Sequence, residues 1–234
     1  GVTAEDSGRL ARVYSKPASD DRPIGSGSAP FREEDVEKGL ALMKQDLNAL
    51  GYWAAEVKIT DRQTDDKGHI NLTIDVDQGA LFKIGTPKIT SINGDGSATI
   101  AEKSKPFVGK DATTANISAM RKEVTEAFTG SGYANAKLTM GRILEGARFV
   151  PDFYLDLGKR VRLRNVEVRG LGKTNVSRIK QRLEKLEGDW YDEAAMNKRV
   201  SEFLGTGAFS SVTLDTDEVG EDQIDLTMDM REAR

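Results

Sequence analysis

The residues that most often carry enzyme chemistry are scarce in this chain. Its 234 residues include no cysteine and a single histidine, His69. That composition excludes thiolate nucleophiles, disulfides, thiolate metal ligands and metal sites built from several histidines. His69 stands where a strand begins and is interpreted as a plain surface or edge histidine. The sequence therefore predicts no enzyme, no cofactor and no metal.

Two short motifs approach ligand-binding loops and fail on spacing. Gly172-Lys173-Thr174 resembles the end of a phosphate-binding loop, but Glu167 stands where the first glycine is needed. The stretch Asp215–Gly220 echoes a calcium loop, yet Val219 and Leu226 occupy positions that must supply oxygen ligands. Both are better explained as turns.

Charge gives a second set of exclusions. The chain has 34 Lys plus Arg against 38 Asp plus Glu, a net charge of −4, which argues against nucleic acid as a partner. A solvated strand face explains the one basic cluster, and an acidic partner or a lipid headgroup is the alternative. The cluster comprises Lys159, Arg160, Arg162, Arg164 and Arg169.

Because no catalytic or metal site is predicted, we expect the function to come from binding surfaces. The sequence also contains an internal repeat. A glycine, an aromatic position, small residues and an alternating apolar stretch occur three times. The glycines, 81 and 75 residues apart, and their aromatic residues are Gly51 and Tyr52, Gly132 and Tyr133, Gly207 and Phe209. We interpret each pair as a helix C-terminal cap. The glycine takes the left-handed conformation, and the aromatic residue covers the helix end.

Other landmarks keep the same order and period. Asp77-Gln78-Gly79 corresponds to Asp156-Leu157-Gly158, and Gly109 corresponds to Gly188, both 79 residues apart. The sequence therefore predicts three modules. We define module 1 as residues 1–80, module 2 as residues 81–158 and module 3 as residues 159–234.

Periodicity predicts β-α-α-β-β order in module 3. The strand Val161–Val168 should carry a bulge or a later start at Asn165. A first helix carries Val176, Ile179, Leu183 and Leu186, and Asp192 should cap a second helix. The strands Ser210–Asp215 and Ile224–Met230 complete the module.

Modules 1 and 2 follow the same order. Module 2 begins with a strand over 82–92, with an edge or a kink at Pro87. Its helices fall near 98–105 and 117–128, and its later strands near 134–144 and 149–157. Module 1 has a helix over 4–14, a loop over 15–30, a second helix over 36–50, and strands over 53–60 and 69–76. No residues supply its first strand, so we expect the chain to begin inside this module.

Tandem modules with these landmarks resemble polypeptide-transport-associated (POTRA) domains of the BamA/TamA outer-membrane assembly family. The three-module pattern is closest to the TamA periplasmic arm, and the resemblance covers the whole chain. It implies an α+β fold of three tandem β-α-α-β-β modules, each a three-stranded mixed sheet covered by two helices. It also implies a soluble arm at the periplasmic face of the outer membrane, followed by a β-barrel. The sequence shows no signal peptide, and we interpret the chain as a segment excised from a longer exported protein.

In this family the second strand of each module is an edge, and an exposed edge accepts an extended peptide as an extra strand. The expected partners are unfolded outer-membrane clients or an assembly subunit. The predicted partner-binding residues are Ala55, Glu56, Val57, Lys58, Ile59, Asn135, Ala136, Lys137, Leu138, Ser211, Val212 and Thr213.

Alternatives remain open at this point. The arm of a two-partner secretion transporter normally has two modules, a structural spacer would bind no client, and a soluble enzyme lacks its motifs. If the first strand of module 1 is absent, the strand holding Ile70, Leu72, Ile74 and Val76 has an unpaired edge. The chain could then dimerise through that edge.

Overall fold

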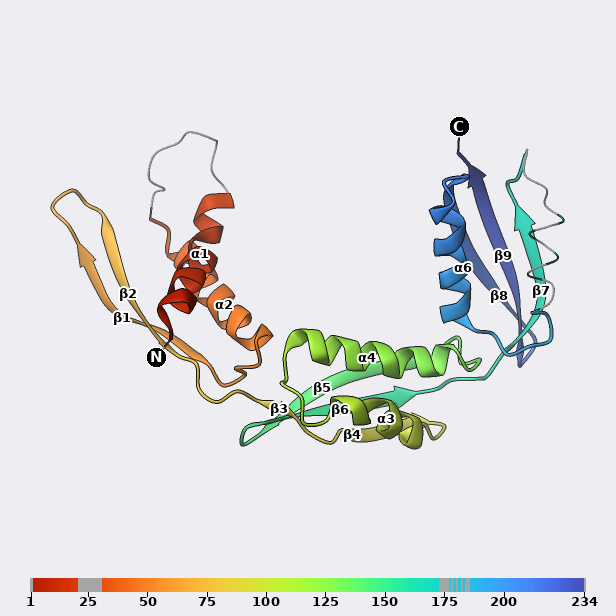
Figure 1. Ribbon diagram of the computed structural model, residues 1–234, viewed down its shortest axis with the longest axis horizontal. Helices are drawn as coiled ribbons and strands as arrows, with labels where there is room; N and C mark the ends of the chain where they lie inside the picture. Colours follow the sequence, from red (N-terminus) through yellow and green to blue (C-terminus); the bar gives the residue numbers. More distant parts are fainter. Residues whose placement is uncertain are drawn as a thin grey trace. The chain divides into compact units, whose positions relative to one another are not determined.

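The computed structural model describes residues 2–20, 31–172 and 186–233, together with Ser177, Ile179, Gln181 and Leu183. The fold is α+β, and Figure 1 shows helices and strands succeeding one another along the chain. The chain divides into two compact units. One comprises Gly1–Thr86, Phe107–Ala119 and Arg142–Pro151, and the other comprises Pro87–Pro106, Met120–Gly141 and Asp152–Arg234.

Module 1 lies in the first unit and consists of two helices and a hairpin. The helices are α1 (Ala4–Asp20) and α2 (Glu33–Ala49), and the antiparallel strands are β1 (Glu56–Thr64) and β2 (Ile70–Asp77). The hairpin turn is held by Asp65, whose Oδ1 accepts hydrogen bonds from two backbone N–H groups of residues 67–69. Among the residues that the structure describes, the sheet of module 1 has these two strands.

The helix α1 is longer than the sequence suggested. A helix ending at Tyr14 and a loop from Ser15 were expected, but α1 continues to Asp20 through Pro17. The loop was predicted from the Pro, Gly and Ser content of residues 15–30. Proline removes one backbone hydrogen bond from a helix interior, but no glycine stands between Tyr14 and Asp20 to end the helix.

Module 2 is built on a sheet with β6 (Arg148–Asp156) at its centre. The short strand β3 (Lys83–Ile84) and β4 (Lys88–Asn93) both pair in parallel with β6, and β5 (Lys137–Glu145) also pairs with it. The helices are α3 (Ser97–Ser104), a 3₁₀ turn η1 (Lys105–Phe107) and α4 (Thr114–Thr129).

The first strand of module 2 was expected over 82–92, with an edge or a kink at Pro87. The structure confirms an interruption there and divides the strand into β3 and β4 at Gly85-Thr86-Pro87. Pro87 has no N–H to donate to the ladder, so pairing stops and resumes at Lys88.

Module 3 lies in the second unit and has the strand order β7-β9-β8. Its elements are β7 (Arg162–Arg169), α6 (Glu193–Gly205), β8 (Phe209–Val219) and β9 (Gln223–Glu232). β7 runs parallel to β9, β8 runs antiparallel to it, and the predicted bulge lies between Leu163 and Asn165. Most of the predicted first helix, Val176 included, lies outside the described residues.

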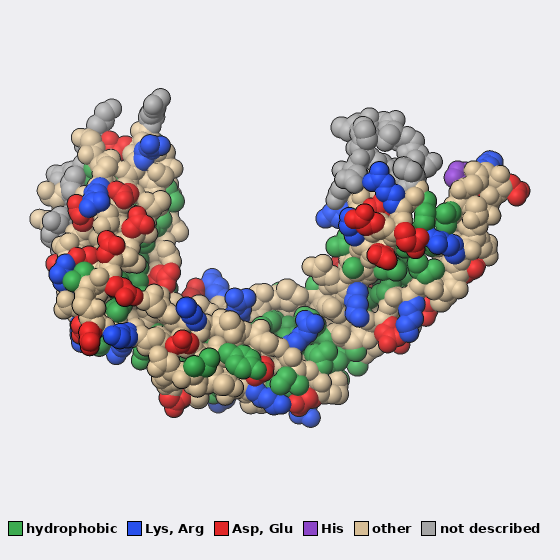
Figure 2. Space-filling model, turned by 180° about the vertical axis from the view of Figure 1, so that it is seen from behind, with side chains coloured by type: hydrophobic (Ala, Val, Ile, Leu, Met, Phe, Trp, Pro, Cys, Tyr) green, Lys and Arg blue, Asp and Glu red, His purple; other side chains and the backbone are tan. Residues whose placement is uncertain are grey.

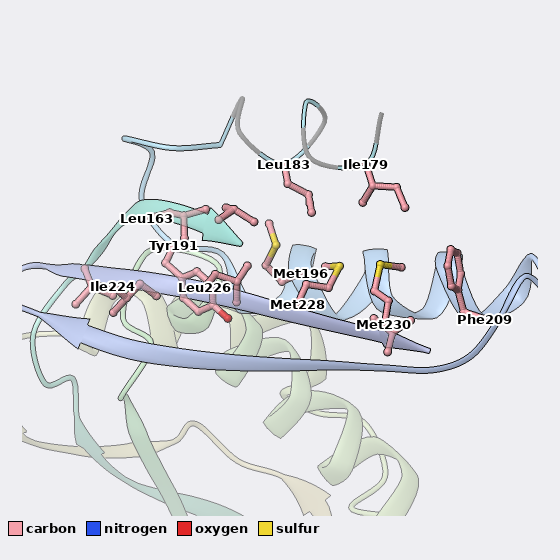
Figure 3. Close-up of a cluster of buried hydrophobic side chains, with 13 residues drawn as sticks. Leu163, Ile179, Leu183, Tyr191, Met196, Phe209, Ile224, Leu226, Met228 and Met230 are labelled. Atoms are coloured by element: carbon pink, nitrogen blue, oxygen red, sulfur yellow. The ribbon is translucent and has the colours of Figure 1, made fainter. Parts of the chain in front are cut away.

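The core of module 3 brings its elements together, as Figure 3 shows. β9 contributes alternate side chains, because residues two apart in a strand point to one face. Its members Ile224, Leu226, Met228 and Met230 are at most 2% exposed. They pack with Leu163, Leu183, Tyr191, Met196 and Phe209, among others.

Candidate functional site

In each module, the strand that follows the last helix has one paired side among the residues that the structure describes. β1 pairs with β2, β5 pairs with β6, and β8 pairs with β9, which is central in its own sheet. The second edge of each of these strands therefore presents backbone N–H and C=O groups outward. These are the strands that the sequence predicted to be edges.

Most of the predicted partner-binding residues lie within these strands. Glu56 is the first residue of β1, which also contains Val57, Lys58 and Ile59. β5 contains Lys137 and Leu138, and β8 contains Ser211, Val212 and Thr213. Exposed and less exposed residues alternate at these positions, so one side-chain face of each edge is accessible.

Three predicted residues lie outside the strands, and their assignment as edge residues is corrected. Ala55 is 1% exposed, in the core of module 1. Asn135 donates from Nδ2 to Glu218 Oε1 at 2.6 Å. The cause is a tight turn that occurs before both β1 and β5. In it the backbone N–H groups of Ala55 and Ala136 donate to the carbonyls of Tyr52 and Tyr133. The strands begin only after this turn.

Charged side chains along the edge of β1 are paired with each other. Lys58 Nζ lies 2.5 Å from Glu56 Oε2. This hydrogen bond lowers the pKa of Glu56 and raises the pKa of Lys58. Figure 2 shows blue and red side chains close together over the visible face, so both signs of charge are available to a partner.

Three arginines of the predicted basic cluster contact other residues of the chain. The guanidinium groups of Arg160 and Arg162 lie 3.8 and 3.9 Å from the ring centre of Trp190. Arg164 forms two hydrogen bonds to Asp225, which lower the pKa of Asp225 and raise that of Arg164. Arg160, Arg162 and Arg164 of the cluster thus have partners within the chain.

Two of the three repeated glycines do more than end helices, and sequence reasoning missed this. Gly51, Gly132 and Gly207 have positive φ angles of 101°, 94° and 71°. The carbonyl of Gly51 accepts a hydrogen bond from Phe82 N at 2.9 Å, and that of Gly132 accepts one from Val161 N at 2.8 Å. Gly51 and Gly132 thus each bind the first residues of the following module.

We call these two contacts the first and second joint, and each lies within one compact unit. The carbonyl of each donor residue accepts a hydrogen bond from the segment just before α4 or α6. Ala112 N donates to Phe82 O, and Tyr191 N donates to Val161 O. A signal was present in the sequence, because Asp77-Gln78-Gly79 and Asp156-Leu157-Gly158 lead into the two donors at the same spacing. The N–H of each of these glycines donates to the aspartate two residues earlier.

Aromatic side chains cover both joints. At the first, Trp53 donates from Nε1 to the Ala112 carbonyl at 2.6 Å, and its ring centre lies 4.8 Å from that of Phe149. At the second, Arg160 Nε donates to the Ser131 carbonyl at 2.6 Å while its guanidinium stacks on Trp190. The backbone contacts are therefore shielded by flat side chains.

The residues considered for chemistry are not brought together. His69 pairs with Asp65 in the hairpin turn, Nδ1 to Oδ2 at 2.8 Å. Within the described residues no cluster of three or more metal-ligating side chains occurs, and no helix there is long and apolar enough to cross a bilayer. Lys173 and Thr174 of the glycine-rich motif lie outside the described residues.

Comparison with known proteins identifies the fold. Residues 15–79 match the POTRA family, described as surface antigen variable number repeat. Over 99% of its length the chain resembles the POTRA3-5 segment of BamA from Haemophilus influenzae, with TM-score 0.60, 20% identity and 92% of that segment covered. The chain has the fold of tandem POTRA domains.

A second solved POTRA protein agrees with this result. BamA from Haemophilus ducreyi lacking POTRA domains 1-3 matches 65% of the chain at TM-score 0.53 and 19% identity, and 30% of that protein is covered. Similarity at this level of identity establishes the fold.

Proposed function

We propose that this chain is a periplasmic arm of an outer-membrane protein assembly or translocation factor of the BamA/TamA kind. Its modules bind extended segments of client polypeptides, or of a partner subunit, by strand addition. The observation that carries the proposal is that the strand after the last helix of each module, β1, β5 or β8, has a free edge among the described residues. The POTRA fold supports it.

Strand addition suits a receptor for many clients. The main-chain hydrogen bonds of an added strand depend little on the client's sequence, whereas side chains along the edge tune preference. A row of three such edges in one chain also raises the effective concentration of a second edge once the first is occupied. We propose the module boundaries at residues 80/81 and 158/159 on the same repeat.

Photo-crosslinking tests this function. A benzoylphenylalanine side chain is placed at Lys58, Lys137 or Thr213, one exposed position on each edge. The matched control is Tyr154, which is exposed on β6, a strand paired on both sides. The probe is a porin diluted from urea, and the same porin folded in detergent is the second control.

We expect the unfolded porin to crosslink at the three edge positions well above the level at Tyr154, and the folded porin to crosslink at none. Equal crosslinking at Tyr154 and at the edges would overturn the proposal. A structural spacer would give no crosslink at any position.

A further inference from the structure

In module 3 the side chains of β8 alternate between the core and an exposed face. Val212 belongs to the core and Leu214 packs against it, whereas Thr213, Asp215 and Asp217 are exposed. These three share one face, because residues two apart in a strand point the same way. The second edge of β8 is unpaired among the described residues, so a strand added there would lie directly beside them.

The neighbouring strands carry matched charges on this exposed face. Asp225 of β9 accepts two hydrogen bonds from Arg164. Farther along β9, Asp229 lies opposite Arg169 of β7, whose guanidinium also donates twice to Glu167. Both aspartates of this face of β9 thus have an arginine beside them on the adjacent strand β7.

The two aspartates of β8 have no such partner. Asp217 lies opposite Asp225, a like charge, and Asp215 lies opposite Thr227. Within the described part of the chain, neither carboxylate of β8 forms a hydrogen bond or an ion pair. Like charges directly opposite each other destabilise a strand pair. The free side of β8 is where a cation could neutralise both carboxylates.

Two other arginines of this face are engaged elsewhere or lie at a distance. Arg162 stacks on Trp190, and Arg231 lies opposite Ser211. Ser211 is four residues before Asp215, or roughly 14 Å along an extended strand. That separation exceeds the screening length of about 10 Å at 0.1 M salt.

We propose that the free edge of β8 selects extended segments with basic side chains at two alternate positions. This preference rests on the proposed function, because it states which client segments the edge takes by strand addition. Backbone hydrogen bonds hold the segment to β8. Its two basic side chains lie beside Asp215 and Asp217, as Arg164 lies beside Asp225. Charge complementarity then adds specificity to a backbone pairing that depends little on sequence.

The edge of β5 offers a comparison within the same chain. The exposed residues over its first half are Lys137, Thr139 and Gly141. None of them is acidic, so we expect no preference for basic segments there. The preference should therefore distinguish the β8 edge from the β5 edge.

The probes are short fluorescent peptides with valine at alternate positions. Between the valines, one peptide carries two lysines, one carries two glutamates and one carries two threonines. The test variant combines Asp215→Asn with Asp217→Asn. The matched control combines Glu123→Gln with Glu202→Gln, which removes the same charge from exposed positions on α4 and α6.

We expect the lysine peptide to bind the wild-type protein saturably at low salt. Its Kd should be about fivefold lower than that of the threonine peptide, the effect of two cross-strand ion pairs. The glutamate peptide should bind most weakly. The test variant should lose this order of affinities and the control should keep it. Equal binding of the lysine and threonine peptides to the wild type, or an unchanged preference in the test variant, would overturn the proposal.

Crosslinking locates the preference without the aspartate variants. With benzoylphenylalanine at Thr213, the lysine peptide should crosslink more than the threonine peptide, whereas at Lys137 the two should crosslink alike. Equal crosslinking of both peptides at Thr213 would overturn the charge preference and still support strand addition. No crosslink at Thr213 with any peptide would contradict strand addition at β8 itself, so the two failures are distinguishable. A dimer in sedimentation that the lysine peptide does not dissociate would assign the edge to a second copy and also overturn the proposal.

Discussion

At the residue scale, the glycine of the repeated motif combines two requirements. Its positive φ ends a helix in a conformation that costs other residues free energy. Its lack of a side chain admits the neighbouring module, since a Cβ on Gly132 would lie 3.0 Å from Arg160 Cγ and 3.2 Å from Trp190 Cβ. Gly207 has the first requirement alone, because nothing lies within 4 Å of its Cβ position.

This difference yields a prediction from two matched substitutions. Gly207→Ala should destabilise the fold by about 1 kcal/mol, the cost of left-handed backbone alone. Gly132→Ala should cost measurably more, because Arg160 and Trp190 must also move. Urea unfolding of both variants measures this, and equal losses would contradict the second joint.

Tyr191 gives a prediction about alkaline stability. Burial raises its pKa to about 12, from 10.0 for the free side chain. The unfolded state therefore loses the phenol proton first, so the stability from this group is complete below pH 10.0 and falls as pH rises through about 12. Tyr191→Phe should flatten this fall. Urea midpoints of both proteins between neutral pH and pH about 11 check it; parallel decreases would contradict it.

At the element scale, the sequence predicted most strands and helices because its stripes and turns are unambiguous. The bulge at Asn165 and the cap at Asp192 were both anticipated. Asp192 Oδ1 accepts from Ala195 N at 2.8 Å at the start of α6. The joints were not anticipated, because a glycine carbonyl that binds a neighbouring module leaves no mark on local periodicity.

The cap can be tested by paired substitutions. Asp192→Ala should lower the free energy of unfolding by about 1 kcal/mol, since it leaves a helix N–H without its acceptor. Asp192→Asn keeps an acceptor oxygen and should be nearly neutral. Thermal unfolding followed by circular dichroism measures both, and an equal loss in the two variants would assign the effect to charge.

The edges show why the site was only partly predictable. Alternation identified the strands, but it could not show that a tight turn delays β1 and β5. Ala55, Asn135 and Ala136 were therefore included in the binding surface although they precede the strands.

At the scale of the whole molecule, module 3 has a core of its own. Its fully buried members come from residues 161–230. A fragment of residues 159–234 should therefore fold cooperatively, with lower stability than in the whole chain because the second joint is lost. Urea unfolding of the fragment measures this, and a non-cooperative transition would contradict the proposed boundary at 158/159.

We propose that the modules bind extended polypeptide through their strand edges. Backbone hydrogen exchange of the whole chain, with and without a saturating urea-diluted porin, is the decisive measurement. We expect slower exchange in β1, β5 and β8, with α2, α4 and α6 unchanged. Protection confined to the helices, or no change in any strand, would contradict it.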